Sequence, residues 1–222
     1  MSKSKVLKLL RPEIKKTIDA LEVKNFRVDP LAGEKYSKVV SVMSSAYKRH
    51  GFILERALLE AVKQNNDLVV WHDFQFQVST AADHMVDSMI ENHSDAFATE
   101  MPFGTGPRTL QVDMITFNKT NGHVASYEVK RGNGLHDAGK KRSILRDLLC
   151  QQVLLKSYAK SKGFDAKTAH VHIVFYYGQC SIKKPFSLVK DELDGHFGLP
   201  VVDAVEAVNM EFKNQLMRML DK

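Results

Sequence analysis

The chain has 222 residues, 44% of them hydrophobic and 26% charged, which is typical of a soluble globular protein with a substantial core. Its net charge of +6 and its pI of about 9.2 are compatible with a polyanionic partner but do not identify one. No apolar run approaches the length of a membrane span, and the N-terminus has too short an apolar stretch for a signal peptide. We therefore expect a cytoplasmic protein.

The N-terminal quarter of the chain is predicted to be helical. Apolar residues recur at three- and four-residue steps over residues 4–24, where Pro12 is expected to interrupt the helix. A second helix is predicted over residues 34–49. Gly51 is expected to break or bend it, so that residues 50–62 form a helical segment of their own.

The segment 50–62 combines an apolar face with two glutamates. Glu55 falls near the edge of that face and Glu60 lies away from it, because five residues correspond to a net rotation of about 140° on a helix with 3.6 residues per turn. A glutamate in such a position is usually solvated or ion-paired. A metal site beneath the helix would be another reason for the placement of Glu55.

The next segments predict a strand and a long connection. Apolar and polar residues alternate strictly toward the end of residues 68–79, which is the pattern of a half-buried strand. The connection over residues 80–109 is expected to contain a short helix at 81–91 and then a loop. Long loops in compact domains are often functional.

Two short apolar runs within residues 110–130 stand on either side of an Asn-Gly turn signal, and they predict a β-hairpin. Asp113 lies on its first strand, and Glu128 and Lys130 lie on its second. Side chains two residues apart on a strand point to the same face, so Glu128 and Lys130 project together. Asp113 lies beside them if the two strands are paired neighbours.

These three side chains suit metal-assisted hydrolysis of a phosphodiester. Two carboxylates can bind a hard divalent cation such as Mg²⁺, and a lysine beside them can steady a water nucleophile or a developing phosphorane charge. The same residues could instead form an exposed cross-strand ion pair. Taken alone, the spacing of Asp113, Glu128 and Lys130 favours this simpler interpretation.

The remainder of the chain is predicted to contain a long helix, a central strand and a C-terminal helix. The helix extends over about 138–162, and Gln151 falls on its apolar stripe, where a buried amide needs partners. The continuous apolar run within 170–178 predicts a strand buried on both faces. An amphipathic helix is predicted over 201–220.

The cysteines and several histidines show no metal-binding pattern. Cys150 and Cys180 are far apart and form no CxxC pair, so we expect buried thiols rather than a disulfide. The spacings of His72, His84 and His93 match no zinc motif, and surface or core positions are expected for them.

The order of helix, strand, hairpin, helix and strand, together with the residues on these elements, resembles the PD-(D/E)xK nuclease superfamily. Glu55, four residues after a glycine, resembles the first-helix glutamate motif of that family. Asp113 resembles the aspartate of the second strand, and the run 128–130 (Glu-Val-Lys) resembles the (D/E)xK motif of the third. Val112 stands where the family name has proline. The resemblance covers about residues 50–178.

The resemblance implies an α/β fold with a restriction-endonuclease-like αβββαβ core. That core has a mixed central sheet flanked by helices. A single nuclease-like domain is expected over residues 1–222. Within it, residues 50–178 would form the catalytic core, and residues 1–49 and 179–222 would be helical additions at the N- and C-terminus.

The resemblance also implies roles for individual residues. Asp113 and Glu128 would bind Mg²⁺, or Mn²⁺ as a substitute, with the carbonyl of Val129 as a further ligand. Lys130 would orient or activate the attacking water. Glu55 would hold a second metal ion or a metal-bound water.

Gln151 would position Lys130 or a phosphate, or would simply be a core-facing glutamine. The basic residues near the hairpin would contact the DNA backbone, or would form a solvated basic loop. They are Arg131, His136, Lys140, Lys141 and Arg142.

The implied function is a metal-dependent DNA endonuclease of the restriction type or the junction or repair type. Two alternatives stay open: a non-catalytic nucleic-acid-binding protein that retains the nuclease fold, and an interaction protein whose charged hairpin is only surface. Because a duplex has two antiparallel strands, a homodimer is also expected, with helix 4–24 or 201–220 as its interface. Packing of both helices on their own core is the alternative.

Overall fold

The computed structural model describes residues 3–90 and 92–221, and these form two compact units. Met1–Gln64 and Leu199–Lys222 belong to the first, which we call the helical unit. Asn65–Gly198 form the second, which we call the sheet unit. These boundaries differ from those expected from the sequence, because residues 50–62 continue a helix of the helical unit.

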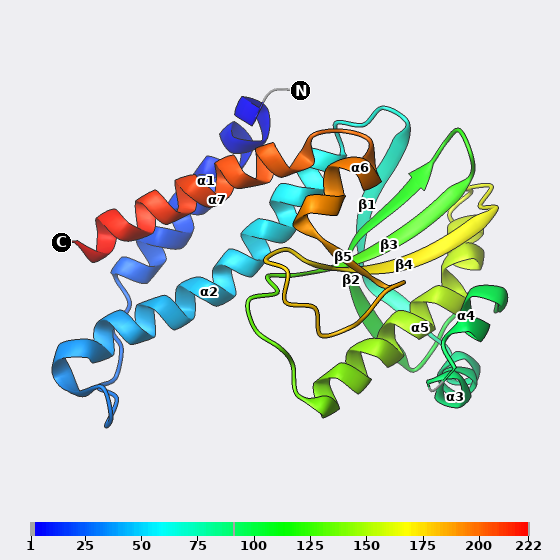
Figure 1. The fold of residues 1–222 in the computed structure, drawn as a ribbon, viewed down its shortest axis with the longest axis horizontal. Helices are drawn as coiled ribbons and strands as arrows, with labels where there is room; N and C mark the ends of the chain where they lie inside the picture. Colours follow the sequence, from blue (N-terminus) through cyan, green and yellow to red (C-terminus); the bar gives the residue numbers. More distant parts are fainter. Residues whose placement is uncertain (1–2, 91, 222) are drawn as a thin grey trace. The chain divides into compact units, whose positions relative to one another are not determined.

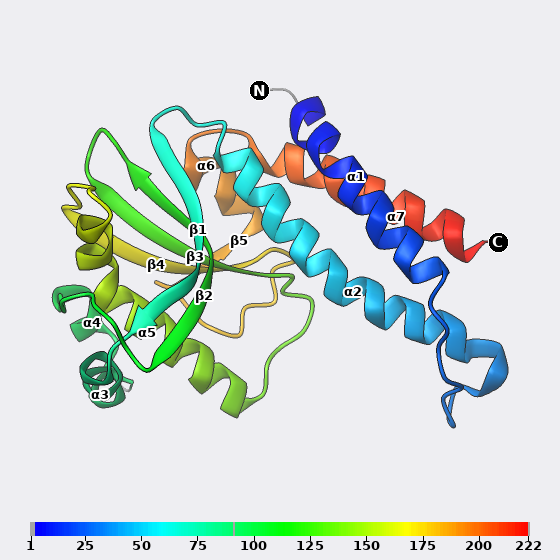
Figure 2. The ribbon, with the colours of Figure 1, turned by 180° about the vertical axis from the view of Figure 1, so that it is seen from behind.

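The helical unit consists of three helices that pack along one another (Figures 1 and 2). They are α1 (Lys3–Glu22), α2 (Gly33–Val62) and α7 (Val201–Leu220). Their apolar stripes face one another, and His50 Nε2 of α2 lies 3.0 Å from Asn209 Oδ1 of α7. Representative buried residues are Leu10, Ile14, Leu21, Leu54, Leu58, Val205, Val208 and Phe212. The stripes of α1 and α7 are thus covered within this unit, and the homodimer stays a prediction.

Two predicted breaks in these helices were wrong. Pro12 lies inside α1, and α2 continues through Gly51 without interruption. A glycine within a helix costs about 1 kcal/mol relative to alanine, whereas each fully buried aliphatic side chain contributes about 1.5–3 kcal/mol. The apolar face of α2 therefore outweighs the local preference of Gly51, and Glu55 belongs to the helical unit.

The sheet unit is built on an open, mixed, five-stranded sheet flanked by helices, with the strands in the order β1-β2-β3-β4-β5. The strands are β1 (Leu68–Val78), β2 (Arg108–Asn118), β3 (His123–Lys130), β4 (Thr168–Phe175) and β5 (Ser187–Val189). Strands β1, β2 and β3 are successively antiparallel, and β3, β4 and β5 are parallel. The α/β class, the mixed sheet and the predicted hairpin are confirmed. Strand β5 was not predicted, because three residues are too few to show a periodic pattern.

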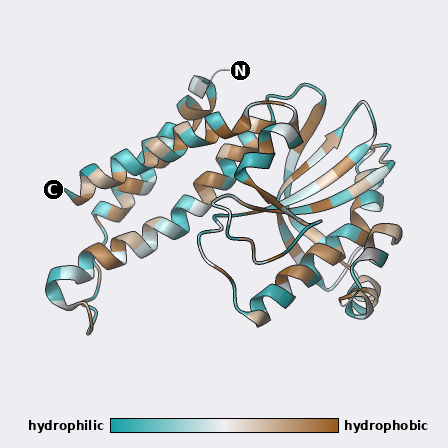
Figure 3. Cartoon of the chain, in the orientation of Figure 1, coloured by the Kyte–Doolittle hydropathy of each residue, from teal (hydrophilic) through white to brown (hydrophobic). Residues whose placement is uncertain are grey.

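The helices of the sheet unit cover different faces of the sheet. They are α3 (Thr80–Met89), α4 (Ser94–Ala98), α5 (Ala138–Ser161) and α6 (Leu193–Phe197), the last of which follows a 3-10 turn over Lys190–Glu192. Helix α5 shares one hydrophobic core with the sheet, α3 and α4 (Figure 1). In Figure 3, hydrophobic and hydrophilic residues alternate along α5, as expected for a helix with one face on a sheet.

Two further observations concern the sequence predictions. Both cysteines are free thiols, with Cys150 buried and Cys180 half-buried. Among the helices in the described part of the chain, none has the length and apolar character needed to cross a bilayer.

Candidate functional site

The pairing of β2 with β3 determines where the candidate carboxylates lie. Met114 is opposite Tyr127, and Ile115 is opposite Ser126. Continuing this antiparallel register by one residue places Asp113 opposite Glu128. The strands are therefore paired neighbours, which was the condition for the predicted cluster.

An irregularity in β2 surrounds Asp113. Trp71 of β1 is opposite Ile115, whereas Asp73 is opposite Val112, so β2 has one more residue than β1 over this stretch. Val112 and Ile115 both belong to the core shared with α5, although they are three residues apart. Such bulges occur beside functional sites and change the direction of a side chain. Here the bulge leaves Asp113 half-buried between two core residues.

The carboxylate of Asp113 is held by the backbone of the neighbouring strand. The N–H of Val129 donates a hydrogen bond of 2.8 Å to Asp113 Oδ2. This bond places the Asp113 carboxylate at the residue between Glu128 and Lys130. A carboxylate fixed in this way needs little reorganisation to bind a cation.

Glu128 and Lys130 form an ion pair and line one pocket of about 160 Å³. Both side chains are partly exposed, Glu128 by 22% and Lys130 by 34%. Their shared pocket confirms that they project from the same face of β3. The other polar residues of the lining, which come from β2 and α5, are Thr109, Gln111, Lys140, Asp147 and Gln151.

Helix α5 contributes one stripe of side chains to this pocket. Lys140, Ile144, Asp147 and Gln151 are spaced by four, three and four residues, so they lie on one face of the helix. The helix begins at an N-cap aspartate, Asp137, whose side chain accepts from the N–H of Lys140 at 2.9 Å. This cap fixes the first turn of α5 and hence the start of the stripe.

Asp147 is a pocket residue that the sequence analysis missed. Its place on the stripe of Gln151, four residues earlier, is the sequence signal that would have identified it. Arg108 Nη1 donates to Asp147 Oδ1 at 2.6 Å, and Arg108 Nη2 donates to Asp83 Oδ1 at 2.6 Å. The bonds to Asp83 and Asp147 raise the pKa of Arg108, so this guanidinium stays charged and neutralises both carboxylates.

Gln151 is both a buried core residue and part of the pocket. Only 3% of it is exposed, and its Oε1 accepts a hydrogen bond of 2.8 Å from Ser126 Oγ of β3. The two interpretations of Gln151 are therefore compatible. The positioning of Lys130 or of a phosphate by Gln151 stays a prediction.

The residues predicted to contact DNA do not all lie in the same pocket. Lys140 lines the pocket of Glu128, whereas Lys141 and Arg142 line a second pocket of the sheet unit. The guanidinium of Arg131 lies 5.7 Å from the ring centre of Tyr177. These cations therefore do not form one continuous row.

His136 is anchored in the loop between β3 and α5. Both its backbone N and its Nδ1 lie 2.9 Å from Ser181 Oγ. Burial, together with the charges of Lys130 and Lys140, lowers the pKa of His136. At neutral pH this side chain therefore acts as a neutral hydrogen-bonding group rather than as a cation.

Glu55 lies on α2 in the helical unit and is half-buried there. Glu60 of the same helix pairs with Lys63 at 2.7 Å. The proposed role of Glu55 in binding a second metal ion stays a prediction.

The predicted metal ligands are few within the described part of the chain. No group of three or more His, Cys, Asp or Glu side chains within residues 3–90 and 92–221 could hold a metal ion by itself. Mg²⁺ at phosphoryl-transfer sites is usually bound by one or two carboxylates, with waters and phosphate oxygens completing its octahedron. Asp113 and Glu128 would supply only two carboxylates to such a site, so their role in binding a metal ion stays a prediction.

Comparison of the chain with protein-family models, with curated proteins and with solved structures gave no match. The function of the site is therefore inferred from its own side chains. Those side chains are a fixed aspartate, a glutamate paired with a lysine, and a buried glutamine beside them.

Proposed function

We propose that this protein is a Mg²⁺-dependent deoxyribonuclease that hydrolyses phosphodiester bonds. The observation that supports it best is the bulged hairpin, in which the strand register puts Asp113 opposite Glu128 and the Asp113 carboxylate accepts from the N–H of Val129, the residue between Glu128 and Lys130. A simple surface ion pair would need neither a bulge nor a backbone hydrogen bond to the aspartate. Whether the enzyme is of the restriction type or of the junction or repair type is decided by its substrate.

The side chains of the site would have different roles in hydrolysis. Asp113 and Glu128 would hold the cation, with the carbonyl of Val129 as the third protein ligand. When bound, Mg²⁺ supplies charge neutralisation at the phosphate and lowers the pKa of a coordinated water. Lys130 would orient the attacking water and stabilise the negative charge that develops on the phosphate.

The ion pair between Glu128 and Lys130 must open when a cation binds. Because both side chains are partly exposed, their attraction is screened by water and is worth about 1 kcal/mol or less. Glu128 would therefore exchange Lys130 for a divalent cation at little cost. Lys130 would then reach toward the phosphate, which is the role that hydrolysis requires of it.

The choice of DNA as substrate is supported by charge. The chain carries a net charge of +6, and three consecutive basic residues, Lys140, Lys141 and Arg142, lie at the start of α5 beside the site. Cations in this position would contact phosphates of the bound strand.

A non-catalytic nucleic-acid-binding protein is the second candidate, and the observed pairing of Lys130 with Glu128 favours it. In that case the same cations would bind DNA, and the carboxylates would only balance Lys130. The two candidates predict the same binding but opposite outcomes in a cleavage assay.

The experiment is a cleavage assay on plasmid, linear, single-stranded and branched DNA, with Mg²⁺ and with a chelator. We expect Mg²⁺- or Mn²⁺-dependent cleavage that Glu128→Gln abolishes. Glu100→Gln is the matched control, because Glu100 also pairs with lysines of the sheet unit, Lys156 and Lys160, but lines a different pocket. Binding without cleavage of any of these substrates would establish the non-catalytic alternative.

A further inference from the structure

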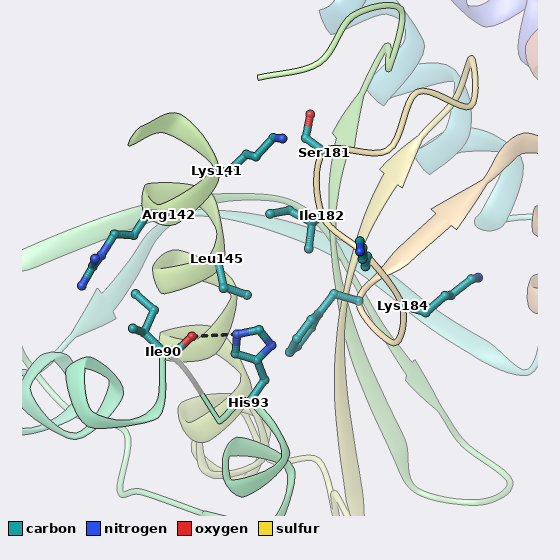
Figure 4. A pocket seen from close by; sticks show the side chains of 10 residues that line it. Ile90, His93, Lys141, Arg142, Leu145, Ser181, Ile182 and Lys184 are labelled. Atoms are coloured by element: carbon teal, nitrogen blue, oxygen red, sulfur yellow. Dashed lines mark hydrogen bonds between the residues drawn. The ribbon is translucent and has the colours of Figure 1, made fainter. Parts of the chain in front are cut away.

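A second pocket, of about 380 Å³, lies beside α5 in the sheet unit (Figure 4). Its wall is formed by three segments that are far apart in the sequence: Ile90 and His93 between α3 and α4, the first turns of α5, and residues 181–186. This volume is in the range of small-molecule sites. The proposed nuclease mechanism makes no use of it.

The floor of this second pocket is apolar and rigid. Ile182 and Phe186 are buried there, and Phe186 stacks on Phe97 with ring centres 5.3 Å apart. His93 lies edge-on to Phe186 at 6.0 Å, and its Nε2 is 2.7 Å from the carbonyl oxygen of Ile90. Aromatic contacts of this kind hold a flat apolar surface in place.

The rim of the pocket is positively charged. Lys141, Arg142 and Lys183 have no carboxylate partner among the described residues, whereas Lys184 pairs with Glu192 at 2.6 Å. None of the described lining residues is acidic. In Figure 4, Lys141 extends toward Ser181, and Arg142 lies on the side of Ile90. An apolar floor beneath unneutralised cations fits a ligand that joins a flat ring to an anion.

We propose that this pocket binds one nucleotide of the substrate strand, with its phosphate on Lys141 and Lys183 and its base on the apolar floor. A nucleotide combines a doubly charged or singly charged phosphate with a planar base of low polarity on its faces, which matches the rim and the floor. That the nucleotide belongs to a substrate DNA strand rests on the proposed nuclease function. The match between a nucleotide and the side chains of the pocket does not.

The positions of the second pocket and of the pocket of Glu128 agree with a single DNA strand that passes both pockets. Consecutive residues diverge by about 100° around a helix, so Lys140 enters the pocket of Glu128 and Lys141 enters the second pocket. Ile144 and Leu145 are divided in the same way. The two pockets thus lie on neighbouring faces of a helix that is about 10–12 Å wide.

Because the two pockets have different lining residues, the nucleotide in the second pocket would be a different one from that at the scissile phosphate. His136, in the loop that follows Lys130, contacts Ser181 of the second pocket and so connects the walls of the two sites.

The pocket also points to a class of substrate. A base that is paired and stacked within a duplex cannot lay its face on the apolar floor of the pocket, and extruding it costs a few kcal/mol, least where the strand is already unpaired. The enzyme would therefore prefer DNA with a single-stranded or frayed segment next to the cleavage position. Junction or repair substrates contain such segments, whereas an intact restriction site does not.

The test is a binding measurement with the full chain in a chelator, where no cleavage occurs. The probes are 5′-phosphorylated pentathymidylate, thymidine 5′-monophosphate, thymidine and inorganic phosphate. The wild-type protein should bind the oligonucleotide most tightly, and the monophosphate should compete with it. The double variant Lys141→Ala/Lys183→Ala should weaken oligonucleotide binding by roughly tenfold or more.

The matched control is Lys119→Ala/Lys213→Ala, which removes the same charge from two exposed lysines that line neither of the two pockets. It should change the affinity by less than about twofold, which excludes a general effect of net charge. Leu145→Trp, which fills the floor, should remove binding of the nucleotide probes but leave binding of inorganic phosphate. Equal affinity of the two double variants would overturn the proposal.

The remaining outcomes separate this proposal from the proposed function. A protein that cuts no DNA in Mg²⁺ but binds nucleotides through Lys141 and Lys183 supports the pocket and refutes the nuclease. A protein that cuts DNA while both double variants bind the oligonucleotide equally refutes the pocket alone. If the monophosphate binds as tightly as the oligonucleotide, the ligand is a free nucleotide and the assignment to the strand is overturned.

Discussion

Strand β3 carries two different polar clusters on its two faces. Glu128 and Lys130 project toward α5 and line a pocket that is open to solvent. Tyr127, one residue away, projects to the opposite face and meets histidines of β4 and α6. Both clusters contain ionisable groups, but only the first one lies in a pocket that is open to solvent.

The histidine cluster is held neutral by burial. Tyr127 Oη lies 2.9 Å from His196 Nε2, and the His172 ring packs against His196 at 4.9 Å and against Tyr127 at 5.4 Å. Burial lowers the pKa of His172 to about 3, with smaller contributions from His196, His170, His123 and Lys184. Burial likewise raises the pKa of Tyr127.

The difference between the two faces of β3 shows that residue type alone does not decide whether an ionisable side chain can take part in chemistry. Tyrosine and histidine are common catalytic groups, but here burial disfavours the charged form of each and makes them packing groups. Glu128 and Lys130 form an ion pair in a pocket that is open to solvent, with both side chains partly exposed. We therefore assign chemistry to the α5 face of β3 and stability to the other face.

The strongest test of this assignment is a pair of substitutions on the two faces. Lys130→Ala should lower the rate of Mg²⁺-dependent cleavage by about 10³-fold, because a positioned cation at a developing charge contributes about 3–4 kcal/mol. Its melting temperature should change little, since the Lys130–Glu128 pair is partly exposed. Asp113→Ala should likewise remove cleavage.

Tyr127→Phe is the matched change on the opposite face of β3. It removes the contact with His196 and should lower the melting temperature while leaving the cleavage rate within about twofold. Cleavage by Lys130→Ala at the wild-type rate, or loss of cleavage in Tyr127→Phe, would reverse the assignment of the two faces.

The histidine face should dominate the acid sensitivity of the protein. His172 has a lower pKa in the folded protein, about 3, than the ordinary 6.5, so the unfolded chain binds its proton first. The stability that comes from neutral His172 is fully present above pH 6.5 and is lost as the pH falls from 6.5 toward 3. The loss should be on the order of a few kcal/mol in the free energy of unfolding.

This prediction is checked by urea unfolding at several pH values between 7 and 4. His172→Phe keeps a ring against Tyr127 but cannot be protonated, so its stability should depend less on pH in this range. His84→Phe is the control, since His84 lies on α3 and is not part of the histidine cluster. Parallel pH profiles for the wild-type protein and His172→Phe would contradict the prediction.

A smaller effect on stability is expected for the hydrogen bond that joins β3 to α5. Ser126→Ala removes the hydrogen bond to Gln151 Oε1 and leaves that buried oxygen without this partner, which should cost about 1–3 kcal/mol of stability. Ser88→Ala removes an exposed bond to the carbonyl of Met85 and should cost less than about 0.5 kcal/mol. Equal denaturation midpoints for the two variants would show that Gln151 does not need Ser126.

The smallest expected effect concerns Glu55 and Glu60, which differ in direction by about 140° around α2. If Glu55 assists a second metal ion, Glu55→Gln should lower the cleavage rate by about tenfold and Glu60→Gln should not. The measurement is the dependence of the rate on Mg²⁺ concentration. Equal rates for the two variants would confine the chemistry to the α5 face of β3.

Local patterns in the sequence determined much of the fold. Period-two alternation and an Asn-Gly turn are sufficient to predict β1 and the hairpin, because strand pairing between neighbouring segments needs only a short loop. The stripe of α5 and the apolar run of β4 were equally clear. The continuity of helix α2 was not clear from the sequence. The helix-breaking preference of Gly51 is a local property, whereas the burial of apolar side chains that overrides it depends on packing with other helices.

The sequence also determined that Glu128 and Lys130 share a face, since this follows from the period of a strand. It did not determine the bulge at Asp113, which depends on the pairing of β2 with β1 more than thirty residues away. Asp147 and Lys183 enter their pockets through contacts of the same long-range kind. Such contacts are decided only when the whole core packs. The same is true of the access of solvent to the pocket of Glu128 and of the burial that keeps His172 neutral.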